Sequence, residues 1–187
     1  MKASRRRSAA VDIGPTTAAD LRELDALIVK PEVMRGYFGA VLAPRHAREI
    51  LLGEWQSCQA NPAAAHLVLR CPQHGRIEIA GAGFLLEGEL RFFVAPARQR
   101  QGLGRALVAA LRRAAEEHQL NELSAWVFPE NHASAKLLEA CGFTARAAMH
   151  VVPYERCSAR PVLQYRLSLD ARPAVVFGLA AQPRAGH

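Results

Sequence analysis

The sequence predicts an α/β (α+β) domain with a mostly antiparallel sheet and one central β-loop-α-β unit. Several short apolar segments, separated by turn residues, lie between residues 66 and 94, which is typical of an antiparallel meander. From residue 102 the apolar spacing changes to that of a helix, and further strand candidates follow it. Because 187 residues can bury one core, we expect a single domain over residues 10–170.

The first part of this domain reads as a short strand at 11–13 followed by two helices. Thr17 is a plausible N-cap of the first helix, with Asp20 at the capping-box position. The second helix is expected at about residues 45–59, where apolar residues recur at helical spacing.

Three strands are predicted next, at 66–70, 77–86 and 89–94. The first should end before Cys71-Pro72, and Gly81 and Gly83 in the second indicate a bulge or close packing.

The second part should contain a helix from Gly102, a strand at 123–128, a helix at 131–140 and two final strands at 143–152 and 162–169. Gly142 is placed to end the shorter helix. Outside the domain, residues 1–9 are basic and expected to be disordered, and residues 171–187 are rich in Pro, Gly and Ala and expected to be loose.

The net charge of +7 is compatible with an anionic cofactor or an acidic partner, but it does not by itself distinguish one function from another. A nucleic-acid-binding module is a weak alternative, because aromatic residues are 6% of the chain and do not alternate with a basic face. The four cysteines form no C-x-x-C pair and do not cluster with histidines, so no metal site is expected.

No apolar run reaches the roughly 20 residues that a membrane helix needs. No hydrophobic segment follows the basic start, so we expect no signal peptide, no membrane association and a cytoplasmic location.

Residues 92–106, with the sequence FFVAPARQRQGLGRA, carry the strongest functional signal. An apolar strand stops at Pro96, a glycine-containing basic turn follows, and a helix begins at once, so several backbone N–H groups converge as they do at pyrophosphate sites. A dinucleotide fingerprint is broken at Leu107, and the Gly-Lys-Ser/Thr of a Walker A loop is absent.

The pattern Gln99-x-x-Gly102-x-Gly104 resembles the acetyl-CoA-binding motif of the GNAT superfamily of N-acyltransferases. The later segments VFPENHAS (127–134) and LLEACGF (137–143) are similar to the next motif of that family. The resemblance implies a sheet of about seven strands with helices on both faces, in which strands 4 and 5 splay apart. Residues 31–35 (PEVMR) and the Ser at 134 are most similar to the branch with ribosomal-protein N-terminal acetyltransferases.

The resemblance also implies a set of acetyl-CoA-binding residues. The strand at 89–94 would lie along the pantetheine arm, and the N–H of Val94 would face the thioester carbonyl. The members are Phe92, Phe93, Val94, Gln99, Arg100, Gln101, Gly102, Leu103, Gly104, Arg105 and Asn131. From the residues alone, the strand side chains could equally be core, the arginines surface charges and Asn131 a helix N-cap.

The sequence identifies the catalytic groups less clearly, because Leu138 occupies the position where many family members have a Tyr that donates a proton to the leaving thiolate. Ser134 is then the candidate general acid. The alternative is that Ser134 is an ordinary residue on a helix surface without a catalytic role. Glu89 is the candidate general base, with a surface or ion-paired carboxylate as the alternative, and Glu87 is a weaker choice.

The predicted function is acetyl-CoA-dependent N-acetyltransfer, directly from the thioester to a primary amine of a protein N-terminus or a small molecule. The predicted partners are acetyl-CoA and this amine, and the chain would be a monomer or homodimer. Segments 30–37 and 149–161 are expected to form the acceptor pocket. A non-catalytic acyl-CoA-binding or sensor protein is the alternative.

Overall fold

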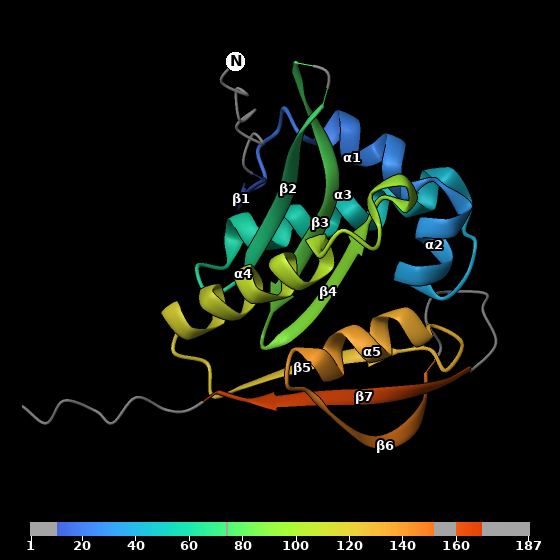
Figure 1. The fold of residues 1–187 in the computed structure, drawn as a ribbon, viewed down its shortest axis with the longest axis vertical. Coiled ribbons are helices and arrows are strands. Elements are labelled where there is room, and N and C mark those ends of the chain that lie inside the picture. Colours follow the sequence, from blue (N-terminus) through green and yellow to red (C-terminus); the bar gives the residue numbers. More distant parts are fainter. Residues whose placement is uncertain (1–10, 74, 152–159, 170–187) are drawn as a thin grey trace, which may run out of the picture.

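The computed structural model describes residues 11–73, 75–151 and 160–169, which form a seven-stranded sheet flanked by helices (Figure 1). The elements of this part of the chain are β1 (Asp12–Pro15), α1 (Leu21–Ile28), α2 (Pro31–Phe38), α3 (Pro44–Ala60), β2 (Ala65–Gln73), β3 (Arg76–Leu86), β4 (Glu89–Val94), the 3-10 turn η1 (Pro96–Arg98), α4 (Leu103–Glu117), β5 (Glu122–Val127), α5 (His132–Ala140), β6 (Thr144–Val151) and β7 (Arg160–Ser168).

The strand order is β1-β2-β3-β4-β5-β7-β6, and every neighbouring pair is antiparallel except β4 and β5. The antiparallel meander of β2, β3 and β4 and the single parallel crossover through α4 are therefore confirmed. The fold-class prediction is confirmed as a whole.

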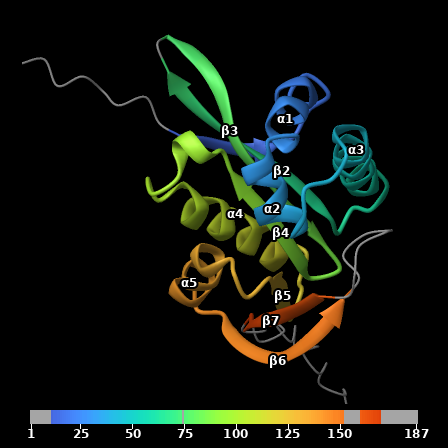
Figure 2. The ribbon, with the colours of Figure 1, turned by 90° about the vertical axis from the view of Figure 1, so that its right-hand side faces the viewer.

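Helices cover both faces of the sheet (Figure 2). On one face, buried residues of α1, α2 and α3 pack with Val68, Ala82 and Phe93 of the central strands. On the other, Leu103 and Leu107 of α4 pack with Leu69 and Ala80. Neighbouring residues of one strand thus serve two cores, as the alternation of strand side chains requires.

The predicted irregularity in β3 is a bulge at Ala80, because Leu69 pairs with Gly81 whereas Arg70 pairs with Ile79. The carbonyl of Ala80 accepts the N–H of Ala95 at 2.7 Å, just past the end of β4. A Cβ on Gly81 would lie 2.3 Å from the Phe93 carbonyl oxygen, so glycine permits the close approach of β3 and β4.

The predicted end of β2 is wrong, since the strand continues through Pro72 to Gln73. Within the described residues β1 pairs with β2 only as far as Arg70, so Pro72 has no described partner strand on that side. A missing N–H costs no ladder bond there.

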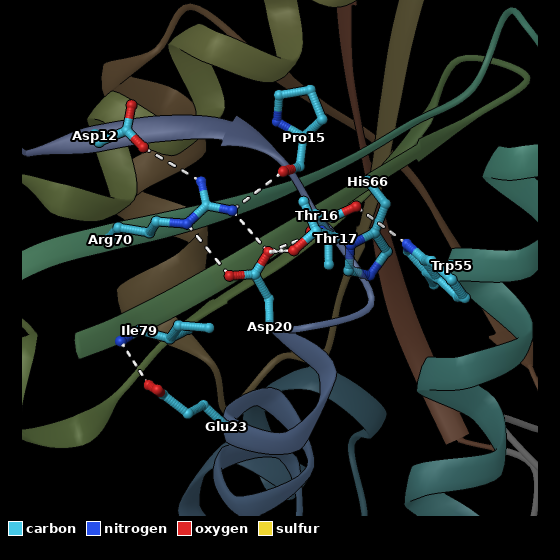
Figure 3. A network of polar contacts seen from close by, with 10 residues as sticks. All are labelled: Asp12, Pro15, Thr16, Thr17, Asp20, Glu23, Trp55, His66, Arg70 and Ile79. Carbon is cyan, nitrogen blue, oxygen red and sulfur yellow. Dashed lines mark hydrogen bonds and ion pairs between the residues drawn. The ribbon is translucent and has the colours of Figure 1, made fainter. Parts of the chain in front are cut away.

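The predicted start of α1 is also wrong, because the helix begins at Leu21 and not beside Thr17. The Thr17 hydroxyl and N–H both donate to the Asp20 carboxylate at 2.7 Å, which closes a turn before the helix. Arg70 also donates to this carboxylate and to Asp12 and the Pro15 carbonyl, and so joins β1, β2 and the start of α1 (Figure 3).

None of the helices in the described ranges is both long and apolar enough to cross a membrane. The predicted disordered segment 1–9, the loose segment 171–187 and residues 152–159 of the predicted acceptor region lie outside the described residues.

Candidate active site

The predicted separation of the two central strands is present between β4 and β5. The two strands share one residue pair, Glu89 with Ser124, next to a bond from the Ser124 N–H to the Gly88 carbonyl. Beyond this pair they diverge, so the end of β4 lies at an opening in the middle of the sheet (Figure 1).

The glycine-containing turn lies at the same end of β4. η1 follows the strand, and Arg100 (φ 63°) and Gly102 (φ 79°) then take left-handed conformations before α4 begins at Leu103. Among the described residues no side chain caps the start of α4, so its first N–H groups stay available at the positive end of the helix dipole. This arrangement suits an anion such as a pyrophosphate.

A cavity of about 620 Å³ joins this turn to β4, α2 and α5. Its lining residues are Glu32, Val33, Arg35, Gly36, Phe92, Phe93, Val94, Pro96, Gln99, Arg100, Gly102, Leu103, Gly104, Arg105, Glu130, Asn131, Ala133, Ser134 and Leu137. The structure thus brings together all the sequence-predicted site residues except Gln101, Glu89 and the weaker candidate Glu87. Gln101 instead donates from Nε2 to the Ala97 carbonyl within the turn.

Several lining side chains also hold the site together. Gln99 donates from Nε2 to the Val94 carbonyl at 3.1 Å, which ties the turn back to the strand. Arg105 donates from Nη2 to the Ala140 carbonyl at 2.9 Å, joining α4 to the last turn of α5. Arg98, outside the lining, forms an ion pair with Glu78 of β3 at 3.3 Å.

The two positions of the motif require glycine for different structural reasons. Gly102 needs its left-handed φ, and a Cβ there would meet nothing within 4 Å. Gly104 lies inside α4, where a Cβ would be 3.3 Å from Leu137 of α5. Gly104 therefore allows close packing of the two helices that border the cavity.

Asn131 connects α5 to α2 across the cavity. Its Oδ1 accepts the Ser134 N–H at 3.2 Å, so the N-cap interpretation is confirmed. Its Nδ2 donates to the Gly36 carbonyl at 3.2 Å. The side chain thus lines the cavity while fixing the separation of α2 and α5.

A second, polar pocket of about 30 Å³ lies between the splayed strands. Its lining residues are Gly36, Tyr37, Leu90, Arg91, Phe92, Ala125, Trp126, Val127, Asn131, Ser134 and Leu138. Gly36, Phe92, Asn131 and Ser134 line both hollows, so the small pocket adjoins the large cavity beside β4.

Glu89 lines neither hollow. It opens β4, about 16 Å along the strand from Val94. Its carboxylate accepts from Trp126 Nε1 at 3.1 Å and forms an ion pair with Arg91 Nε at 3.2 Å. Through these two partners it contacts the wall of the small pocket.

The model of the Acetyltransferase (GNAT) domain family matches residues 11–144 of the chain. The chain belongs to the GNAT acetyltransferase family. The resemblance drawn from the glycine motif and the Asn131 segment is thereby confirmed, as is the prediction of an acetyltransferase enzyme. No curated protein sequence matches this acetyltransferase.

Solved acetyltransferase structures share the fold at low sequence identity. A spermidine N-acetyltransferase from Vibrio cholerae, solved with CoA and spermine, has a TM-score of 0.67 at 21% identity, covering 86% of this chain and 96% of that one. An enzyme from Salmonella typhimurium that modifies the N-terminal serine of ribosomal protein L7/L12 has a TM-score of 0.69 at 17% identity, covering 87% and 97%. A putative acetyltransferase from Salmonella typhimurium with its cofactor acetyl-CoA has a TM-score of 0.60 at 20% identity, covering 88% and 97%.

This acetyltransferase also buries a carboxylate that the sequence does not single out. Glu54 of α3 accepts from the Tyr37 hydroxyl at 2.7 Å and from Arg91 Nη1 at 2.8 Å. Burial raises the pKa of Glu54 above its ordinary value, although Arg91 and Tyr37 act in the opposite direction. One sequence signal existed, because Glu54 continues the buried stripe of Ala47 and Leu51 at helical spacing.

Proposed function

We propose that this acetyltransferase uses acetyl-CoA and transfers the acetyl group directly to a primary amine. The observation that carries the proposal is the cavity of about 620 Å³, which runs from the uncapped start of α4 to the C-terminal end of β4. It is lined by eleven of the predicted site residues named above.

In this proposal the pyrophosphate lies at the turn, against the N–H groups of residues 100–105. Arg100 and Arg105 line the cavity and add positive charge, and Gly102 provides the backbone conformation that the turn needs. The pantetheine arm would run along Phe92, Phe93 and Val94. The Val94 N–H would then stabilise the oxyanion that forms as the amine attacks.

Ser134 is the proposed proton donor for the departing thiolate. It lines both hollows, so a thioester beside Val94 and an amine in the small pocket would both be near it. The Asn131 bond to its N–H fixes its place in the first turn of α5.

Glu89 stays a prediction as general base. Its ion pair with Arg91 and its bond from Trp126 connect it to the small pocket, although it does not line that pocket. A Glu89→Gln enzyme whose pH–rate profile matches that of the wild type would contradict a role in deprotonating the amine.

Primary amines are the proposed acceptor class. Two of the structural neighbours act on spermidine and on an N-terminal serine, which are both of this class. Glu32 and Glu130 line the cavity beside Arg35, Arg100 and Arg105, and Glu130 is paired with Arg160, so the charge of the lining does not by itself select the acceptor.

The deciding experiment is a thiol-release assay with acetyl-CoA against peptides, polyamines and aminoglycosides. We expect CoA release that depends on the amine, with an equal amount of acetylated amine by mass spectrometry. Tight acetyl-CoA binding without turnover across the panel would instead support the acyl-CoA sensor.

A further inference from the structure

The small pocket between β4 and β5 is backed by a buried acidic group. Glu54 is 7% exposed, and no other carboxylate in the described part of the chain is buried. Glu54 comes from α3 and does not line the pocket itself. A buried carboxylate costs free energy unless its partners compensate, so these partners define what the group can do.

Two residues of the pocket wall bond Glu54 directly. Tyr37 donates from its hydroxyl to Oε2 at 2.7 Å, and Arg91 donates from Nη1 to Oε1 at 2.8 Å. The Tyr37 ring is held edge-on against Phe93, with ring centroids 5.4 Å apart, and Phe93 lines the large cavity. Tyr37 therefore stands between Glu54 and the place where the two hollows meet.

The dimensions of the pocket favour a small polar group. A volume of about 30 Å³ accepts a water molecule or an ammonium group but not a whole side chain. Its position next to Phe92 and Ser134 places such a group beside the proposed thioester site.

We propose that Tyr37 and Glu54, in place of Glu89, form the proton-accepting pair for the acceptor amine. Tyr37 touches the amine nitrogen in the small pocket, and Glu54 is the positioning residue that holds the proton behind it. The inference rests on the proposed acetyl transfer and specifies how its acceptor is activated.

Each proton that moves in this reaction has a donor and an acceptor among these groups. The acceptor enters as an ammonium ion and gives one proton to the Tyr37 oxygen while the Tyr37 hydrogen passes to the Glu54 carboxylate. The neutral nitrogen attacks the thioester carbon, the C–N bond forms and the C–S bond breaks. Ser134 gives its hydroxyl proton to the departing thiolate and takes a second proton from the nitrogen in return. Glu54 then releases its proton to solvent.

The charges around Glu54 agree with this role. From β4, Arg91 faces it with an ion pair and Glu89 adds a second negative charge behind Arg91. From α2, Tyr37 donates to it, and on its own helix Cys58 is held as a thiol because burial and Glu54 raise its pKa to about 12. Burial raises the pKa of Glu54 itself, which brings a carboxylate closer to the range of a useful base.

The test compares Tyr37→Phe and Glu54→Gln with wild type on two acceptors. One is an α-amine with an ordinary pKa of about 8, and the other is an alkyl amine with a pKa of about 10.4. We expect each variant to lose about 10²-fold or more in kcat/KM for the alkyl amine at pH 7. The loss should be smaller for the α-amine and should shrink for both as the pH rises toward the pKa of the amine, because solvent then supplies the neutral form.

Matched controls are Tyr165→Phe and Glu49→Gln. Tyr165 also donates from its hydroxyl to a glutamate, Glu139 at 3.2 Å, and Glu49 lies on α3 in an exposed ion pair with Arg45. Both controls should keep wild-type rates and pH profiles. Thermal unfolding with and without CoA shows that each variant is folded, and Tyr37→Phe retains the ring packing if Glu54→Gln does not fold.

The outcomes separate the two proposals. If wild type acetylates no amine, the proposed function fails. If wild type is active and the variants lose the same factor for both amines at every pH, or lose nothing, the Tyr37–Glu54 assignment is overturned while the proposed function stands.

Discussion

At the scale of single residues, two glycines should respond oppositely to the same substitution. Gly102 has φ 79° and Gly53 is an ordinary residue of α3, and a Cβ would meet nothing within 4 Å at either. Gly102→Ala should therefore destabilise the protein by about 1–2 kcal/mol through backbone strain alone. Gly53→Ala should stabilise it by roughly 0.5–1 kcal/mol. Urea unfolding measures both, and equal effects would contradict the strained turn.

His66 should make stability depend on pH. It is buried beside Thr16, with Nδ1 and Oγ1 2.8 Å apart, and burial lowers its pKa to about 4 (Figure 3). The unfolded chain takes up a proton on this residue near pH 6.5, and the folded protein does so only near pH 4. Its contribution is therefore complete above about pH 6.5 and is lost as the pH falls toward 4, by about 3 kcal/mol.

The measurement is the free energy of unfolding in urea between pH 7 and pH 4. In His66→Gln this decline should be weaker by about that amount. His118→Gln retains His66 and should follow the wild-type curve. A His66→Gln protein with the full wild-type decline would show that other groups cause it.

At the scale of elements, Arg70 joins three of them. Its ion pair with Asp20 at 2.7 Å has side-chain exposures of 19% and 12%, whereas the pair of Arg112 with Glu116 on α4 has 45% and 43%. Burial alone would raise the pKa of Asp20, yet bonds from Arg70 and Thr17 hold it below the ordinary value. Arg70→Met should cost about 2–3 kcal/mol, because it leaves the half-buried Asp20 carboxylate without its guanidinium.

Arg112→Met is the matched control, and it should cost less than about 0.5 kcal/mol because exposed helical pairs contribute little. Chemical unfolding of the two variants gives the comparison. Similar costs would mean that the Arg70 contacts do not join β1 and α1 energetically.

The elements that could be predicted are those whose signals are local. The turn before α4 and the start of α5 follow from Gly102 and Asn131 and their neighbours, and most of the cavity lining came with them. The start of α1 was missed because Arg70, 50 residues away, takes part in holding Asp20. The pairing of Tyr37 with Arg91 around Glu54 was missed for the same reason, since β4 meets α2 and α3 only in the folded chain.

At the scale of the whole molecule, CoA should bind across the opening of the sheet and stabilise the fold. At a concentration of 100 times Kd, a ligand that binds only the native state adds about 2.7 kcal/mol. For a chain of this size this raises Tm by roughly 5–10 °C. Differential scanning calorimetry with CoA and with duplex DNA tests it, and a shift with DNA alone would favour the nucleic-acid-binding module.

The single pairing of Glu89 with Ser124 also has a consequence for how the molecule opens. β1 to β4 form one hydrogen-bonded ladder and β5, β7 and β6 another, and within the described residues the Glu89–Ser124 pair is the one strand pairing between them, while α4 packs on both. Amide hydrogen exchange should therefore resolve two cooperative units that exchange with different free energies. Bound CoA, which would touch both units, should make the amides of the two ladders exchange together.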